Sequence, residues 1–333
     1  MSQAVGPADV GRLAGTILDE VERAVVGKRL ALQQVLVGML AKGHVLMEDF
    51  PGLAKTLVAR SFGQAIGLGY SRIQFTPDLL PTDVTGSSVY NPRDGELTFQ
   101  PGPIFASLVL GDEINRATPK TQSALLEAMG EQQVTVDGST RPLPSPFVVL
   151  ATQNPIEFEG TYPLPEAQLD RFVMRVRIGY PEPADEAEML QRRMDRGSPV
   201  VELDGVTDRA TFLAMQEAVE SVHVATDLVD YVVSLVRATR SHAGVRVGAS
   251  PRGSLALLTT SRALAAVCGR DFVTPEDLKA LAVPCLAHRL DLRAELWVRG
   301  TTGADIVTEC LATVPLPPTQ ATEPATVARG SAP

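Results

Sequence analysis

The spacing of apolar residues changes along the chain and divides it into parts. Residues 8–42 carry apolar side chains three or four positions apart, as in Leu13 and Ile17, which predicts helices. Between residues 44 and 178, short apolar runs alternate with further helical patterns. Beyond residue 184 only the helical spacing continues. The middle part therefore predicts a parallel β-sheet covered by helices on both faces, with ligands at the carboxyl ends of its strands.

The predicted elements of this middle part alternate regularly. Strands are expected at 44–48, 70–75, 108–110, 147–152 and 172–178, and helices at 54–66, 118–129 and 165–170. Two segments interrupt the alternation. Residues 87–100 and 132–144 each place an Asp-Gly pair between short β-prone runs, so each predicts a hairpin.

Two prolines in the sequence Tyr-Pro-Glu-Pro at 180–183 mark a boundary. Helices are expected after it at 184–196, 208–222, 226–241, 250–268 and 274–287, with no convincing strand. Thr274 followed by Pro275 is typical of a helix start, because Thr caps the helix and Pro suits its first turn. We expect a flexible N-terminus (1–9), an α/β core (10–183), an all-α lid (184–314) and a disordered tail (315–333) rich in Pro, Thr and Ala.

The strand expected at 44–48 is followed by a loop that ends in Lys-Thr and then by a helix. A triphosphate needs backbone N–H groups around its oxygens, and a helix N-terminus supplies them with a favourable dipole. Lys55 would face the outer phosphates, and the Thr56 hydroxyl would bind the metal ion. The usual pattern, G-x-x-x-x-G-K-[ST], is incomplete, because Asp49 and Ala54 replace its glycines and Gly52 lies between them. Ala54 would still allow close approach if its φ stays negative.

Polar side chains also end two later strands. Asp112 could hold Mg²⁺, and its neighbour Glu113 could polarise a water for attack on the γ-phosphate. Asn154 could reach the γ-phosphate or that water. Each feature has a simpler interpretation, namely an exposed lysine, a solvated pair of acids and a turn-forming Asn before proline. Their order along one predicted sheet favours a nucleoside-triphosphate site.

The composition narrows the class of protein. The chain has 333 residues, enough for two domains, and its 44% hydrophobic share suits an ordinary globular core. No apolar run reaches about 18 residues, and the N-terminus has no signal-peptide pattern, so we expect a cytoplasmic protein without a membrane segment. The formal net charge of −9 argues against a general nucleic-acid-binding face. The three cysteines, Cys268, Cys285 and Cys310, are expected to be buried small hydrophobic residues.

Ten short motifs follow one another in order. They are 24–28 (AVVGK), 48–56 (EDFPGLAKT), 74–86 (QFTPDLLPTDVTG), 100–105 (QPGPIF), 111–116 (GDEINR), 120–129 (KTQSALLEAM), 151–155 (ATQNP), 157–164 (EFEGTYPL), 165–172 (PEAQLDRF) and 248–252 (GASPR). Together they resemble the AAA+ ATPases and, within them, the MoxR family, over about residues 10–315. The resemblance implies an α/β fold, an AAA+ P-loop NTPase domain with a central parallel sheet, followed by a small all-α lid domain. The family tolerates Asp and Ala in the phosphate loop.

The resemblance implies a role for individual residues. Lys55 and Thr56 match Walker A. Asp112 and Glu113 match Walker B, with Glu113 as the catalytic base, and Asn154 matches sensor 1. The implied contacts to ATP come from Val26, Gly27, Pro51, Gly52, Leu53, Ala54, Lys55, Thr56 and Leu57, and those to Mg²⁺ from Thr56 and Asp112.

Two arginines and one turn have implied roles that their surroundings alone would not suggest. Arg171 matches the arginine finger, which enters the neighbouring subunit's site, and Arg252 matches sensor 2. The simpler interpretation is an arginine at the surface end of a helix. Val26 and Gly27 match the segment that packs near the adenine, although they could form a plain turn between two helices.

The resemblance also implies an assembly and a task. The family usually forms a hexameric ring and uses ATP hydrolysis to remodel or mature a client protein, often beside a von Willebrand factor A domain protein. The two hairpins resemble the helix-2 insert and the pre-sensor-1 hairpin, which touch the client, although each could be a plain connection. The client cannot be read from the chain. Three alternatives stay open: a nucleotide-gated scaffold with little hydrolysis, a nucleic-acid motor and a magnesium-chelatase-like motor subunit.

Overall fold

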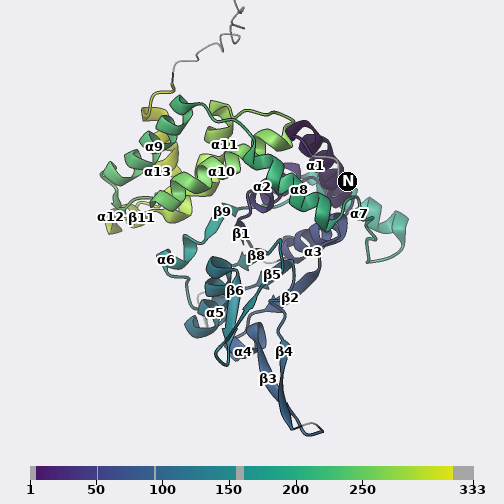
Figure 1. Ribbon diagram of the computed structural model, residues 1–333. Helices are drawn as coiled ribbons and strands as arrows, with labels where there is room; N and C mark the ends of the chain where they lie inside the picture. The colour runs from purple at the N-terminus through teal and green to yellow at the C-terminus, as the bar shows by residue number, and fades with distance from the viewer. Residues whose placement is uncertain (1–4, 51, 94, 155–160, 318–333) are drawn as a thin grey trace, which may run out of the picture.

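A five-stranded sheet lies at the centre of the computed structural model, which describes residues 5–50, 52–93, 95–154 and 161–317 (Figure 1). In spatial order the strands are β2 (Tyr70–Gln74), β5 (Leu108–Asp112), β8 (Val148–Gln153), β1 (His44–Glu48) and β9 (Phe172–Val176). All neighbouring strands are parallel, as predicted. The sheet therefore has a carboxyl edge, where all five strands end, and an amino edge, where all five begin.

Helices cover both faces of this sheet. They are α1 (Pro7–Glu22), α2 (Arg29–Leu40), α3 (Lys55–Ile66), α4 (Pro81–Thr85), α5 (Pro119–Glu131) and α6 (Glu166–Leu169). In β1, Val45 and Met47 belong to one hydrophobic cluster, which includes residues of α1, α2 and α3. Leu46 belongs to a second cluster, which includes residues of α5. This division follows from strand geometry, because successive side chains point to opposite faces.

Both predicted hairpins are present. In the first, β3 (Gly86–Asn91) pairs with β4 (Glu96–Pro101), and in the second, β6 (Gln133–Val136) pairs with β7 (Ser139–Pro142). The second hairpin turns at Asp137 and Gly138, whose φ values of 52° and 74° are those that a two-residue hairpin turn requires. The β3–β4 hairpin extends away from the body of the molecule (Figure 1).

The chain beyond β9 is mainly helical. Its helices are α7 (Pro183–Arg196), α8 (Arg209–Glu220), α9 (Thr226–Ser241), α10 (Pro251–Val267), α11 (Pro275–Leu286), α12 (Ala294–Val298) and α13 (Gly303–Thr313). Three features differ from the expectation. The helices α12 and α13 were not anticipated, and β10 (Val245–Val247) pairs antiparallel with β11 (Asp291–Leu292). Strands this short carry too few residues to produce a recognisable alternation.

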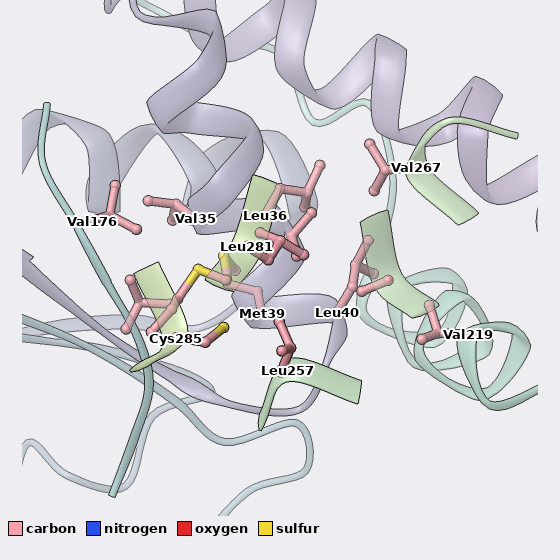
Figure 2. Packing of buried hydrophobic residues seen from close by; sticks show 14 of the residues in the cluster. Val35, Leu36, Met39, Leu40, Val176, Val219, Leu257, Val267, Leu281 and Cys285 are labelled. Atoms are coloured by element: carbon pink, nitrogen blue, oxygen red, sulfur yellow. The ribbon is translucent and has the colours of Figure 1, made fainter. Parts of the chain in front are cut away.

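The lid shares a hydrophobic core with the helices that cover the sheet. In Figure 2, Leu36 and Met39 of α2 lie near Leu281 and Cys285 of α11 and Leu257 of α10, and all belong to one cluster. The cluster crosses the expected boundary at residue 183, so apolar packing holds the lid against the α1–α2 side of the core. The division of the chain into separate domains stays a prediction.

The three cysteines do not all behave as expected. Cys285 and Cys310 are buried, and burial raises the pKa of the Cys285 thiol to about 11, so it acts as a small apolar residue. Cys268 is exposed, so the expectation for it was wrong. It is the C-cap of α10 and lies beyond the last buried turn of that helix.

Candidate nucleotide-binding site

The loop between β1 and α3 lies at the carboxyl edge of the sheet. Lys55 is the first residue of α3, and Gly52 has a φ of 81°. Ala54, the N-cap of α3, has a φ of 56°, so the condition of a negative φ is not met. A residue with a Cβ pays roughly 1–2 kcal/mol in this left-handed region. Ala54 therefore adopts at the start of α3 a conformation that glycine would adopt without this cost.

Asp49, which replaces the first glycine of the usual pattern, fastens this loop to the chain beyond β9. Its carboxylate accepts the N–H of Phe50 at 2.9 Å and the N–H of Gly179 at 2.5 Å. Lys55 Nζ donates to the main-chain oxygen of Asp49 and, at 3.4 Å, to that of Gln153. The aspartate therefore has a structural reason of its own, which the glycine pattern does not anticipate.

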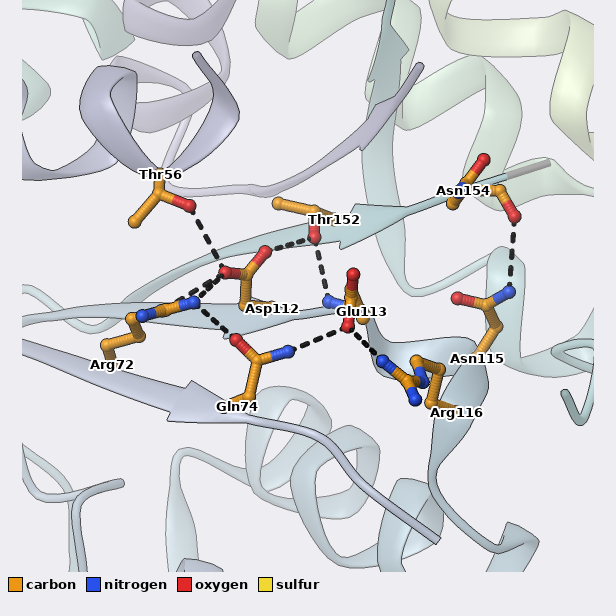
Figure 3. Close-up of polar contacts among 9 residues, drawn as sticks. All are labelled: Thr56, Arg72, Gln74, Asp112, Glu113, Asn115, Arg116, Thr152 and Asn154. Carbon is orange, nitrogen blue, oxygen red and sulfur yellow. Dashed lines mark hydrogen bonds and ion pairs between the residues drawn. The ribbon is translucent and has the colours of Figure 1, made fainter. Parts of the chain in front are cut away.

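The Thr56 hydroxyl, in the first turn of α3, lies beside the Asp112 carboxylate, at the end of β5 (Figure 3). The Thr56 hydroxyl donates to Asp112 Oδ2 at 3.1 Å, and the Thr152 hydroxyl donates to Asp112 Oδ1 at 2.6 Å. Asp112 is only 6% exposed. In proteins Mg²⁺ is usually bound through one or two carboxylates together with phosphate oxygens and water. The donor set of Asp112 and Thr56 fits that ion.

Glu113 follows Asp112 and is held by several contacts. Its backbone is left-handed, with a φ of 56°, and its N–H donates to Thr152 Oγ1 at 2.8 Å. The Thr152 hydroxyl therefore links both acids. The Glu113 carboxylate accepts from Gln74 Nε2 at 2.8 Å and from Arg116 Nη1 at 3.0 Å (Figure 3). These contacts fix the direction of an acid that the sequence assigned to general-base catalysis.

Arg72 is a functional candidate that the sequence analysis missed. Its Nε and Nη2 donate to Asp112 Oδ2 at 3.1 and 2.7 Å, and Nη2 also donates to Gln74 Oε1. Arg72 and Gln74 lie two positions apart on β2, so they point to the same face. The signal that could have found them was this alternation at the end of a strand expected beside the acids. Together they connect Asp112 to Glu113.

A cavity of about 440 Å³ lies over these residues. It is lined by Gly52, Leu53, Ala54, Lys55, Thr56, Leu57, Arg72, Gln74, Asp112, Glu113 and Asn154. Its size is that of an ordinary small-ligand site. Asn154 is 4% exposed, and its main-chain oxygen accepts from Asn115 Nδ2 at 3.3 Å. The structure thus brings the expected phosphate loop, acid pair and Asn154 together, whereas Pro51 lies outside the described residues.

Arg171 and Arg252 lie away from this cavity. Arg171 directly precedes β9, whose last residue, Val176, pairs with Met47 of β1. At about 3.3 Å per residue, Arg171 is roughly 16 Å back along the strand, at the amino edge. Its Nη1 donates to the main-chain oxygen of Leu126 near the C-terminal end of α5, a favourable place for a cation. Arg252 is exposed in the first turn of α10.

Val26 and Gly27 also lie outside the residues that line the cavity. They fall between α1 and α2, and Gly27 has a φ of 71°. A Cβ at Gly27 would lie 2.1 Å from Asp185 Cγ, near the start of α7. The turn is therefore closely packed and suits glycine. The contact of these two residues with adenine stays a prediction.

The fold and the site define the class of this protein, and comparison with known proteins agrees. Residues 44–174 match the ATPase family associated with various cellular activities (AAA), and residues 237–310 match the AAA lid domain. The crystal structure of a candidate ATPase from Cytophaga hutchinsonii superposes with a TM-score of 0.86 at 38% identity, covering 93% of this chain and 96% of that one. The class is that of the AAA+ ATPases.

Two relatives narrow the class further. The chain is 44% identical to Chaperone MoxR1 of Mycobacterium tuberculosis, over 90% of this chain and 81% of that protein. It is 47% identical to the protein named Uncharacterized protein YeaC of Bacillus subtilis, over 93% of this chain and 96% of that protein. The chain belongs to the MoxR family of AAA+ ATPases. Within its described residues, no helix has both the length and the apolar character needed to cross a membrane.

Proposed function

We propose that the protein binds ATP with Mg²⁺, hydrolyses it within a hexameric ring, and uses the hydrolysis to remodel or mature client proteins. One observation carries the proposal. The phosphate loop, the acid pair and Asn154, which are far apart in sequence, line a single cavity at the carboxyl edge of the sheet. This is the edge at which α/β proteins bind ligands.

Each residue of the cavity has a task suited to its chemistry. Lys55 would face the outer phosphates, and the backbone N–H groups at the start of α3 would surround their oxygens. Thr56 and Asp112 would hold Mg²⁺, which when bound offsets phosphate charge. Glu113 would accept a proton from the attacking water, and Asn154 would orient that water beside the γ-phosphate.

We assign Arg171 and Arg252 to the site of a neighbouring subunit. Both belong to the amino edge, since Asp170, the residue before Arg171, accepts a hydrogen bond at 2.9 Å from Ser250, the N-cap of α10. Neither arginine lines the cavity of its own chain, and Arg171 lies roughly 16 Å along β9 from the strand end beside β1. A ring in which one subunit's amino edge meets the next subunit's carboxyl edge would complete each site. The hexamer itself is inferred from the family resemblance.

The β3–β4 hairpin is the part of the chain that we propose contacts the client. Tyr90 and Leu97 pair across the hairpin and are 60% and 71% exposed. Exposed apolar pairs on a projecting hairpin suit contact with another protein better than with nucleic acid. A partner with a von Willebrand factor A domain rests on the resemblance alone, and the cytoplasmic location stays a prediction.

A nucleotide-gated scaffold is the second candidate, and two contacts favour it. Arg72 occupies Asp112 Oδ2, and Arg116 engages Glu113, so both acids are paired with arginines. If ATP and Mg²⁺ did not displace these arginines, the protein would bind nucleotide but barely hydrolyse it. No structural observation favours the magnesium-chelatase-like alternative.

ATP turnover measured against protein concentration, for wild type and Glu113→Gln, separates the two candidates. An assembled ATPase should show turnover per subunit that rises with concentration, and Glu113→Gln should bind ATP without this turnover. Wild-type protein that binds ATP and forms rings but shows no more turnover than Glu113→Gln would favour the scaffold and contradict the proposal.

A further inference from the structure

Asp170 connects the amino edge of the sheet to the lid. Its Oδ1 accepts from Arg289 Nε at 2.7 Å, and its Oδ2 accepts from the Ser250 hydroxyl at 2.9 Å. Arg289 ends the short 3-10 helix that follows α11, and Ser250 caps α10, so both partners come from the lid. We name these three residues, Asp170, Ser250 and Arg289, the Asp170 cluster.

Arg289 makes the most extensive contacts of the cluster. Its side chain is 3% exposed, and it donates to the main-chain oxygens of Phe172 at 2.6 Å and Val173 at 3.2 Å, as well as to that of Cys285. The planar guanidinium can donate five hydrogen bonds in fixed directions, which a lysine cannot reproduce. One buried side chain from the lid thus fixes both the carboxylate of Asp170 and the first residues of β9.

His288, which directly precedes Arg289, is uncharged where the lid meets β9. Its Nε2 lies 3.3 Å from the main-chain oxygen of Phe172. Burial, together with the nearby positive charges of Arg289 and Arg175, holds the pKa of His288 well below its ordinary value. The charge that balances Asp170 at the junction is therefore that of Arg289.

The cluster lies next to both arginines that we assign to the neighbouring site. Asp170 directly precedes Arg171. The Ser250 oxygen that donates to Asp170 also accepts the N–H of Arg252 at 3.1 Å. Arg289 passes beside the following residue, Gly253, where an added Cβ would lie 3.4 Å from Arg289 Cδ. The backbones that carry Arg171 and Arg252 are thus attached to one shared set of hydrogen bonds.

We propose that the Asp170 cluster positions Arg171 and Arg252 as one unit, so that both reach the same γ-phosphate of the neighbouring subunit. This inference rests on the proposed function. Attachment of the lid alone does not require the cluster, because apolar residues of α2, α10 and α11 already pack together. The cluster adds a fixed position of Arg171 relative to Arg252, which lie on different elements. Catalytic groups need such placement, since an error of about 1 Å can cost about 100-fold in rate.

The test compares Asp170→Asn and Ser250→Ala with wild type. Asp170→Asn removes the charge that Arg289 balances but keeps the size of the side chain. Ser250→Ala removes only one hydroxyl and serves where Asp170→Asn is too unstable to study. We expect kcat to fall about 10- to 100-fold in Asp170→Asn and less in Ser250→Ala, with the KM for ATP and ring assembly unchanged within about twofold.

Asp277→Asn is the matched control. Asp277 forms an ion pair with Arg270 at 2.6 Å that is also largely buried, but both residues belong to the lid and neither contacts Arg171 or Arg252. We expect this variant to lower the melting temperature without changing kcat at a temperature where it is folded. An equal loss of kcat in Asp277→Asn would mean that lid stability, not positioning, sets the rate, and would overturn the inference.

Mixing experiments give a readout that a purely structural defect would not move. A subunit with Asp170→Asn keeps its own Lys55 and Glu113, whereas a Glu113→Gln subunit keeps intact arginines, so mixed rings should recover part of the turnover. If Arg171→Ala is complemented by Glu113→Gln but Asp170→Asn and Ser250→Ala are not, the positioning role is overturned and the trans role of Arg171 stands. If Arg171→Ala itself is not complemented, the trans assignment in the proposed function fails, and this inference fails with it.

Discussion

The two edges of the central sheet differ in what they can do within a single chain. At the carboxyl edge, Thr56, Asp112 and Glu113 converge on one cavity, and every acid there has a partner from the same chain. At the amino edge, Arg171 is turned onto its own helix α5, and Arg252 is exposed. The comparison teaches that the acids of the cavity and the pair Arg171 and Arg252 lie at opposite edges of the sheet, so the proposed role of these two arginines requires a second subunit.

The largest expected effect tests the carboxyl edge. Glu113→Gln should keep ATP binding and lower turnover about 10²–10⁴-fold, because it removes a positioned base. Steady-state turnover and calorimetric ATP binding check this outcome. Glu217→Gln, on the exposed surface of α8, is the control and should match wild type. Turnover at the wild-type rate in Glu113→Gln would show that another group acts as the base.

The amino edge is tested by Arg171→Ala. The variant should bind ATP normally and hydrolyse it poorly, because each active site then lacks the neighbour's cation. A trans arginine can contribute about 10³–10⁵ in rate in GTPase activation, and we expect a smaller loss here. In mixtures with Glu113→Gln, turnover should partly return. If co-assembled mixtures stay inactive at every ratio, Arg171 does not act on the neighbouring subunit's site, and the proposed separation of roles between the two edges is contradicted.

Lys55→Ala sharpens the account of the phosphate loop. Removing this cation should weaken ATP binding by about 10- to 100-fold, the range expected for a hydrogen bond to a charged group. Isothermal titration measures the change, with Lys279→Ala, an exposed residue of α11, as the control. Equal ATP affinity in Lys55→Ala and wild type would exclude this loop as the phosphate site.

The smallest expected effect concerns backbone strain at the same loop. Ala54 has a φ of 56°, so Ala54→Gly should raise the free energy of unfolding by about 0.5–1 kcal/mol, the strain relieved less the added entropy of the unfolded chain. Gly52→Ala, at a φ of 81°, should lower it. Denaturant unfolding measures the free energy of unfolding of both variants. A loss of stability in Ala54→Gly would contradict the left-handed conformation.

Much of the carboxyl edge could be predicted because its residues follow local patterns. The strands β1, β5 and β8 each contain an apolar run. The Lys-Thr pair ends the loop after β1, the acid pair stands at the end of β5, and Asn154 directly follows β8. The condition of a negative φ at Ala54 is not met, and the sequence could not show this because a pattern of residue types does not report the backbone angles of a turn. Cys268 was misplaced because helical periodicity does not say where the buried part of a helix stops.

The sequence by itself determined the alternation of strands and helices, the two hairpins and the residues of the phosphate loop, since these depend on neighbours a few positions away. Only the tertiary structure decided which distant residues meet. Arg72 donates a hydrogen bond to Asp112, 40 positions away in sequence, and Arg289 donates one to Asp170, 119 positions away. Such pairings depend on strand order and on how the lid packs against α1 and α2. The physical reason is that the hydrophobic effect is non-directional. A local apolar pattern therefore indicates that a surface will be buried, but it does not indicate which part of the chain will bury it.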